Sequence, residues 1–302
     1  MKDEIIRIKS ITQLHEMLGF EKPKHPLISV IDVSRLKITK DMINVKTATN
    51  MYYIGLKSAD CGIRYGRNHY DFAEGVLAFH GPNQVSYATS EKEFDKESGW
   101  MLFFHPDLIR TTPLGENIEN YSFFSYDVHE ALHLSDKEKQ TLNDCVEKIR
   151  EEYNERIDNH SQRVIVSSLE LLLNYCSRFY ERQFNTRTAK NKDVVTQVES
   201  ILKDYYKSGQ LTEYGPPSLH FIADKVNLSP TYLSDLLKKE TGRSAKDHIN
   251  DFLVEKAKNM LLGTEDSVSE IAYSLGFNYP HYFSRLFKIK TGLSPQKYRD
   301  LN

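Results

Sequence analysis

Cysteine is scarce in this chain of 302 residues, and its three cysteines, Cys61, Cys145 and Cys176, stand far apart. An odd, scattered set argues against a disulfide framework and against a zinc cluster. Long apolar runs are also missing, since no stretch approaches the roughly 18 apolar residues that a membrane span needs. The first ten residues mix acids with bases and hold no apolar segment, so they predict no signal peptide. These absences favour a globular protein of the reducing cytoplasm.

Excess charge of either sign is lacking as well. The formal net charge is −2, with 39% hydrophobic and 27% charged residues, which is typical of a globular protein long enough for two domains. From residue 193 to the end, bases and acids both number fourteen, yet the segment from Ile271 to Arg299 holds five bases and no acid. Any role in binding nucleic acid must therefore come from where the charges lie and not from their sum.

The first 132 residues predict a β-rich domain. Six short segments are rich in β-branched or aromatic residues, and Gly, Pro, Asn and Asp separate them. Many short strands with frequent turns favour a β-barrel or a double-sheet jelly roll. The predicted strands are Ile28–Asp32, Met51–Ser58, Gly75–His80, Gln84–Thr89, Gly99–His105 and Tyr121–Tyr126.

Two helices are predicted over residues 133–184. The first begins at a Ser-x-x-Glu capping box, Ser135 to Glu138. The second carries apolar residues spaced four, three, four and three apart, which is the spacing of a short a/d seam. One interpretation is a helix packed on its own domain, the other is the subunit interface of a homodimer, and the sequence leaves both open. The dimerisation interpretation assigns the interface to Ile165, Leu169, Leu172, Cys176 and Phe179.

The residues from Glu181 to Lys192 are polar and basic without helical periodicity, which predicts a linker over 185–192. From 193 to 302 the pattern is helical and broken by short turns. A helix from Lys246 to Leu262 is expected near the middle of this part, because it carries an apolar stripe.

One structural unit occurs twice in the last hundred residues, over 219–249 and again over 268–299. Each copy has a first helix with a small residue for close packing, a turn at a residue that tolerates positive φ, and an apolar side chain after the turn. In the two copies these residues are Ala223 and Ala272, Asn227 and Gly276, and Leu228 and Phe277. A second helix then begins at a predicted N-cap, Ser229 in the first copy and Asn278 in the second. This arrangement predicts two helix-turn-helix units.

The second helix of each unit has a polar face opposite its apolar residues. Short polar and basic side chains at i, i+3, i+4 and i+7 suit contacts to base edges and phosphates in a DNA groove. The alternative is a merely solvated face, and two units with matching faces make that the weaker interpretation. The residues predicted to contact DNA are Thr231, Ser234, Asp235 and Lys238 in the first unit, and His281, Ser284, Arg285, Lys288 and Lys290 in the second.

The second unit resembles the AraC/XylS family of bacterial transcription regulators. The family pattern is Ile-Ala, Gly-Phe, Tyr-Phe-Ser-Arg-x-Phe-Lys and Gly-x-Ser-Pro-x-x-Tyr-Arg. The matching residues are Ile271-Ala272, Gly276-Phe277, Tyr282 to Lys288, and Gly292 to Arg299. The chain departs from the family at Asp235, and at Leu253 four residues before Ala257, since arginine is frequent at both places. These departures imply weaker phosphate contact by the first unit.

The segments WMLFFHPDLI, PLGENIENYSFFSY and EALHLSDKEK are similar to the cupin-type sensing domain of the same family. The resemblance implies an α+β fold with a cupin-like β-barrel over 1–132 and a helical dimerisation segment over 133–184. A linker over 185–192 and an all-α double helix-turn-helix domain over 193–302 then follow. The implied function is a sequence-specific DNA-binding regulator that responds to a small-molecule effector and activates transcription by contacting RNA polymerase. A repressor or a ligand-independent regulator is the alternative.

Two other functions compete with this one. A cupin-type metal enzyme would need closely spaced histidines, but His69, His80 and His105 are scattered and no His-x-His pair occurs. These three are expected to be turn or core histidines. A DNA-repair protein that shares the helix-turn-helix domain would need a reactive cysteine cluster, which three distant cysteines do not supply. The sequence therefore predicts no enzyme activity, no metal and no cofactor.

Overall fold

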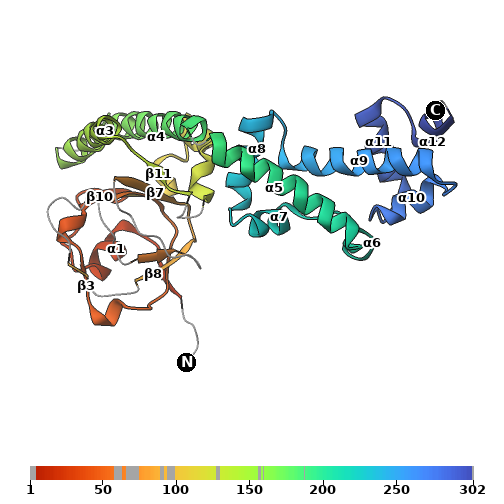
Figure 1. The fold of residues 1–302 in the computed structure, drawn as a ribbon. Helices are drawn as coiled ribbons and strands as arrows, with labels where there is room; N and C mark the ends of the chain where they lie inside the picture. The colour runs from red at the N-terminus through yellow and green to blue at the C-terminus, as the bar shows by residue number, and fades with distance from the viewer. Residues whose placement is uncertain are drawn as a thin grey trace. The chain divides into compact units, whose positions relative to one another are not determined.

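The computed structural model describes residues 5–57, 63–65, 75–88, 92–93, 99–126, 130–155, 158, 160–186 and 188–300. The chain divides into two compact units, Met1–Thr186 and Arg187–Asn302 (Figure 1). Unit 1 combines β-sheets with helices, and unit 2 is helical, which confirms the α+β class. No helix in the described ranges has both the length and the apolar character that a membrane crossing requires.

The strands of unit 1 form three sheets. A five-stranded sheet has the order β11-β7-β5-β10-β2, a four-stranded sheet has the order β1-β4-β8-β6, and β3 pairs with β9. The β1–β4 pairing is parallel and the other strand pairings are antiparallel. The pairings among the described strands do not close a barrel. The strands are β1 (Ile6–Ile8), β2 (Ile28–Asp32), β3 (Lys37–Ile38), β4 (Thr47–Thr49), β5 (Tyr52–Lys57), β6 (Ile63–Tyr65), β7 (Val76–His80), β8 (Val85–Ala88), β9 (Lys92–Glu93), β10 (Gly99–Phe104) and β11 (Leu132–His133).

Five of the six predicted strands are confirmed as β2, β5, β7, β8 and β10, but the prediction for Tyr121–Tyr126 is wrong. That segment forms the 3-10 helix η5 (Ser122–Ser125). Phe123 and Phe124 are both buried, whereas successive residues of a strand would point to opposite faces. The helical turn lets both rings contact Phe79, with ring centroids 4.3 and 5.8 Å away.

The helices of unit 1 include a long pair, α3 and α4, that packs against the outer face of the five-stranded sheet. The predicted capping box starts α3, since Ser135 Oγ accepts from Glu138 N and Glu138 Oε2 accepts from Ser135 N at 2.8 Å. Trp100 of β10 donates from Nε1 to Asn143 Oδ1 of α3 at 2.8 Å. The helices are α1 (Ile11–Met17), η1 (Val33–Arg35), η2 (Lys40–Met42), η3 (Pro106–Leu108), α2 (Pro113–Asn117), η4 (Ile118–Asn120), α3 (Asp136–Asn154) and α4 (Ser161–Thr186).

The apolar seam of α4 belongs to the core of unit 1. Within the single chain, its five residues are buried to between 0 and 7% exposure. Helix α3 and strand β11 contact α4, so the seam offers no surface to a second subunit. The first interpretation, a helix packed on its own domain, therefore describes Ile165, Leu169, Leu172, Cys176 and Phe179, and the dimerisation assignment of these residues is corrected.

The predicted linker is helical on both sides of Arg187, because α4 runs to Thr186 and α5 begins at Thr188. This stretch contains neither glycine nor proline, and Gln183 and Phe184 are both buried at the end of α4. One buried apolar residue does not give a helical period, so the pattern did not reveal the helix. Gln183 is buried and bonds to backbone groups of His133 and Ala131, at 2.8 and 3.2 Å. Hydrogen bonds from Gln183 and the buried ring of Phe184 together hold the end of α4 in place.

Unit 2 contains eight helices in its described part, 188–300. One hydrophobic core runs through it and takes residues from both repeats, from α5 and from the connecting helix α9. Val198 and Leu202 of α5, Leu253 and Ala257 of α9, and Phe287 of α11 are among its buried members. The helices are α5 (Thr188–Lys207), α6 (Gln210–Tyr214), α7 (Leu219–Lys225), α8 (Pro230–Thr241), α9 (Ala245–Gly263), α10 (Val268–Ser274), α11 (Pro280–Thr291) and α12 (Pro295–Asp300).

Candidate nucleic-acid interface

The first helix-turn-helix unit consists of α7, a short turn and α8. The turn is closed by a backbone hydrogen bond from Leu228 N to Ala223 O at 3.0 Å. Asn227 adopts φ +55° in this turn, as the sequence predicted. The predicted N-cap is also confirmed, since Ser229 Oγ accepts from Tyr232 N at 3.2 Å and starts α8.

The second unit, α10 and α11, repeats the same turn. Phe277 N donates to Ala272 O at 3.0 Å, which is the counterpart of the bond in the first unit. Gly276 has φ +79°. The start of α11 differs from the prediction, because its N-cap is Tyr279 and not Asn278, and no side chain caps it. Pro280 in the first turn lacks an N–H and removes one donor that a cap would satisfy.

Gly276 also touches the segment that precedes the first unit. A Cβ at this position would lie 2.4 Å from Leu211 O and 2.7 Å from Gly215 Cα. Next to this contact, Thr212 Oγ1 donates to Ser274 O at 3.3 Å. Helix α6 and the turn after it therefore dock on the turn of the second unit, and this contact fixes the second unit within the domain.

The outward faces of α8 and α11 are those that the spacing predicted. Leu233, Leu236 and Leu237 of α8 are buried, as are Phe283 and Phe287 of α11. In Figure 1, α8 and α11 lie on one side of α9, with α7 and α10 on the other. Among the predicted contact residues, Thr231, Ser234, Asp235 and Ser284 are partly exposed, and Lys238, His281, Arg285 and Lys288 are exposed.

Lys290 has a different environment from the other predicted residues. Its Nζ lies 2.7 Å from Asp247 Oδ1 and 2.9 Å from Asp251 Oδ1, both on α9. The hydrogen bond from Lys290 lowers the pKa of the Asp247 carboxyl to about 2, and the bonds from Ser244 act in the same direction. The same bond raises the pKa of Lys290. Lys290 thus ties α11 to α9, and its contact with phosphate stays a prediction.

Arg299 is a second base of the acid-free segment that is engaged within the domain. Its Nε donates to Leu261 O at 3.0 Å, and its Nη2 donates to Asp266 O at 2.6 Å. Helix α12 is thereby held against the end of α9. The exposed bases of this segment are Arg285, Lys288, Lys290 and Lys297, and Lys290 among them is paired with two carboxylates of α9.

Two tyrosines at the start of α11 were missed by sequence reasoning. Tyr279 and Tyr282 are 59% and 58% exposed and lie beside His281, whose ring centroid is 4.3 Å from that of Tyr282. The available signal was that Tyr282 stands one residue before the core residue Phe283 and so falls outside the apolar period.

Two of the histidines considered as metal ligands, His80 and His105, lie in the described part of the chain. His105 caps η3, where its ring accepts from Asp107 N at 3.2 Å, and His80 lies at the end of β7. His69 and Cys61 fall outside the described residues. Within the described ranges, no three His, Cys, Asp or Glu side chains are grouped as they would be around a metal ion.

Several known proteins are similar to this chain in sequence. A protein-family model described as a helix-turn-helix domain matches residues 222–300. The uncharacterized HTH-type transcriptional regulator YijO of Escherichia coli is 29% identical over 142 residues, which are 47% of this chain and 46% of that protein. The HTH-type transcriptional activator RhaS of an Enterobacter strain is 25% identical over 255 residues, 78% of this chain and 87% of that protein. A solved transcriptional regulator of Chromobacterium violaceum with an AraC-type DNA-binding domain is 21% identical, with a TM-score of 0.33, over 37% of this chain and 94% of that one.

The chain spans half or less of the length of the first curated relatives that it matches, at 46%, 43% and 33%. These relatives are described as HTH-type transcriptional regulators and not as enzymes. The family match coincides with the two helix-turn-helix units of the structure. Residues 222–300 therefore match a helix-turn-helix domain, and the chain is similar to HTH-type transcriptional regulators.

Proposed function

We propose that this protein regulates transcription by binding specific DNA sequences through α8 and α11. The observation that carries the proposal is the repeated turn, closed by the same backbone bond in both units, with an exposed polar or basic face on the helix that follows. Because α9 and one shared core join the units, the two helices enter successive major-groove segments of one duplex, about 34 Å apart.

The two recognition helices contribute differently to binding. On α11, Arg285 reads a guanine and Lys288 contacts phosphate, while His281 and Ser284 lie at the groove. On the predicted contact face of α8, Lys238 is the exposed base, and the partly exposed Asp235 reduces the local positive charge. Most of the phosphate neutralisation therefore comes from the second unit.

Unit 1 serves as the sensing part of the regulator in this proposal. Its two larger sheets form an open variant of a cupin-like fold, and an effector bound there alters the affinity for DNA. Activation through contact with RNA polymerase in the cytoplasm is favoured over repression, and the similarity to a protein described as an activator supports this choice. If the protein pairs into a homodimer, the exposed face of α4 with Val164 and Leu171, 42% and 43% exposed, replaces the buried seam as the contact.

The experiment compares Arg285→Ala with Arg285→Lys on DNA sites enriched from a random pool. Arg285→Ala loses the contact to guanine, worth about 1–3 kcal/mol, and relaxes that position of the site, whereas Arg285→Lys keeps donors that can reach guanine and should relax it less. Only the alanine variant loses a positive charge, so it alone has a shallower dependence of affinity on salt. Unchanged sequence preference in both variants would refute this docking.

A further inference from the structure

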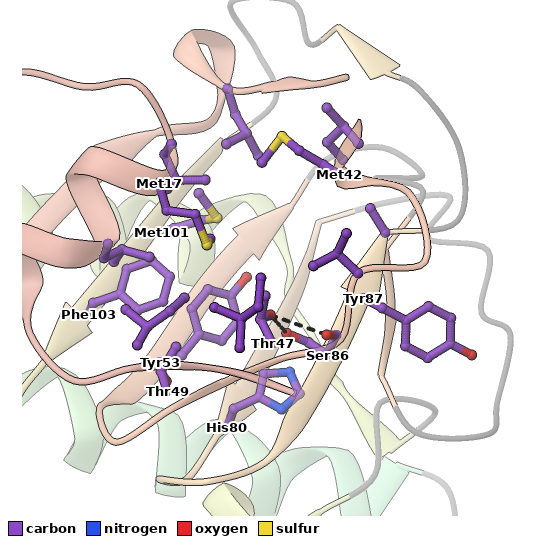
Figure 2. Close-up of a pocket in the computed structure, with 18 of the residues that line it drawn as sticks. Met17, Met42, Thr47, Thr49, Tyr53, His80, Ser86, Tyr87, Met101 and Phe103 are labelled. Atoms are coloured by element: carbon purple, nitrogen blue, oxygen red, sulfur yellow. Dashed lines mark hydrogen bonds between the residues drawn. The ribbon is translucent and has the colours of Figure 1, made fainter. Parts of the chain in front are cut away.

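Unit 1 contains a cavity between its two larger sheets (Figure 2). The cavity has a volume of about 310 Å³. Its walls come from β1, β4 and β8 of one sheet and from β5, β7 and β10 of the other. Residues of α1 and of the segment from β3 to η2 cover it, with Leu14, Met17, Ile38 and Met42 among them. A partly enclosed space of this kind between two sheets is a common place for a small ligand.

One wall is a row of three rings set by the strand register. Phe103 of β10 pairs with Tyr53 of β5, and Tyr53 pairs with His80 of β7. The ring centroids of Phe103 and Tyr53 are 5.1 Å apart, and those of Tyr53 and His80 are 5.3 Å apart. Figure 2 shows Thr47 and Ser86 of the other sheet near Tyr53 and His80, while Met101 and Phe103 lie further along the cavity. The cavity therefore has a polar end and a longer apolar end.

Hydrogen bonds fix the polar end. Gln84 Nε2 donates a hydrogen bond to Phe124 O at 3.0 Å, which turns Gln84 Oε1 toward the His80 ring. Gln84 Oε1 therefore accepts a hydrogen bond from His80 Nδ1–H at 2.7 Å. This leaves the acceptor lone pair of the imidazole on Nε2. Burial lowers the pKa of His80 to about 3, so the ring is neutral at physiological pH. Thr47 Oγ1 donates to Ser86 O at 3.2 Å, and its own oxygen can accept from a ligand.

The cavity interior carries little charge. Among the described residues that line it there is no lysine, arginine or glutamate, and the one acid, Asp41, has an exposed side chain at the edge. Lys57 lies on the same face of β5 as Tyr53 and contributes to the low pKa of His80, but it is not part of the lining. An ion moved from water into such a space loses hydration that the lining does not replace.

The volume limits the size of the guest. A cavity of about 150 Å³ binds benzene in another protein, and this one is roughly twice as large. It therefore accommodates a molecule of roughly nine to twelve non-hydrogen atoms. Flexible methionines at three places in the lining, Met17, Met42 and Met101, let its shape adapt to chains or rings.

We propose that this cavity binds a small uncharged amphipathic molecule, with its hydrogen-bonding group at Thr47, Ser86 and His80 and its hydrocarbon part against Met101, Phe103 and the α1 side chains. The inference rests on the proposed function in one respect, because the bound molecule is then the effector of the regulator. The chemical class follows from the cavity itself, through its neutral polar end and its apolar walls.

The test titrates the full-length protein at pH 7.5 with three probes of equal chain length, 1-octanol, octanoate and octylammonium, in a calorimeter without DNA. We expect 1-octanol to bind at least ten-fold more tightly than either ion. Ser86→Phe places a ring in the cavity and should reduce 1-octanol affinity at least ten-fold. Val85→Phe makes the same change on the opposite face of β8, at a residue that does not line the cavity, and should leave affinity unchanged.

Thr47→Val keeps the shape of the side chain and removes its hydroxyl. It should weaken 1-octanol by about five-fold, as expected for one neutral hydrogen bond, and it serves as the second variant if Ser86→Phe does not fold. Octanoate or octylammonium binding as tightly as 1-octanol overturns the uncharged class. Binding of none of the probes, or unchanged binding in both cavity variants, overturns the site. If 1-octanol binds as expected but leaves DNA affinity unaltered, the inference stands and the effector role fails.

Discussion

Gly276 should be the position in unit 2 that tolerates a methyl group least. Its φ of +79° disfavours any residue with a Cβ, and that Cβ would meet Leu211 O at 2.4 Å and Gly215 Cα at 2.7 Å. Both neighbours are backbone atoms, so neither can rotate away. Gly292 has the same φ of +79°, but no atom lies within 4 Å of its Cβ position. Gly292→Ala is therefore the matched control for Gly276→Ala.

The two substitutions share one cost and differ in another. The left-handed conformation costs an alanine about 1–2 kcal/mol at either position. Overpacking adds about 1–3 kcal/mol at Gly276 alone. We expect Gly292→Ala to lower the free energy of unfolding of unit 2 by about 1–2 kcal/mol, and Gly276→Ala to lower it by about 2–5 kcal/mol.

Urea unfolding of the full chain separates the two units by signal. The single tryptophan, Trp100, lies in unit 1, so its fluorescence follows that unit alone. Circular dichroism at the helix band follows both units. A circular dichroism transition that occurs without a change in tryptophan fluorescence therefore reports the unfolding of unit 2. Equal losses of stability in the two variants would show that the contact with Leu211 and Gly215 does not constrain the turn.

Three further predictions follow from the ion pairs, the exposed bases and the buried seam. In a double-mutant cycle of Lys290→Met with Asp247→Asn, we expect a coupling of about 0.5 kcal/mol, because both side chains are partly exposed. Folding lowers the Asp247 pKa from 3.8 to about 2. The stabilisation by this pair is therefore complete above pH 4 and is lost as the pH falls through 2. Urea unfolding at a series of pH values should show the free energy of unfolding fall toward low pH. Lys288→Ala should reduce the slope of log affinity against log salt by about one, measured by fluorescence anisotropy, whereas Lys207→Ala on α5 should leave the slope unchanged. Leu169→Asp with Leu172→Asp should unfold unit 1, because both leucines are fully buried, and Leu171→Asp on the exposed face should leave its tryptophan transition in place; a folded double variant would contradict the burial.

The elements with strong periodicity were predictable from the sequence. The repeat, its turns and the core faces of α8 and α11 follow from apolar spacing and from residues that accept positive φ, such as Asn227 and Gly276. The segment Tyr121–Tyr126 was not predictable in this way, because its aromatic residues have strand propensity but pack as a helical turn. The end of α4 was missed because one of its two buried residues, Gln183, is polar, and Phe184 alone gives no apolar period.

The candidate site was predictable to a similar degree. Exposure of Arg285 and Lys288 follows from the helical period of α11. The roles of Lys290 and Arg299 do not follow from this period, because their partners are distant in sequence. Lys290 bonds to Asp247, 43 residues away, and Arg299 bonds to Leu261, 38 residues away. Sequence separation of this size hides an ion pair from any local pattern. The cavity of unit 1 was hidden for the same reason, since its lining comes from strands of two sheets.

The docking of α6 on the second turn has a consequence for anyone who transplants this domain onto another sensor. A graft that starts at residue 222, where the family match begins, omits Val198, Leu202 and Leu211 from the shared core. It also removes the backbone of Leu211 and Gly215, which packs against Gly276. Such a chimera would carry both recognition helices but would expose the part of the shared core that α5 and α6 normally cover. A graft that keeps this core should begin at the boundary of unit 2, near Arg187, and not at the start of the family match.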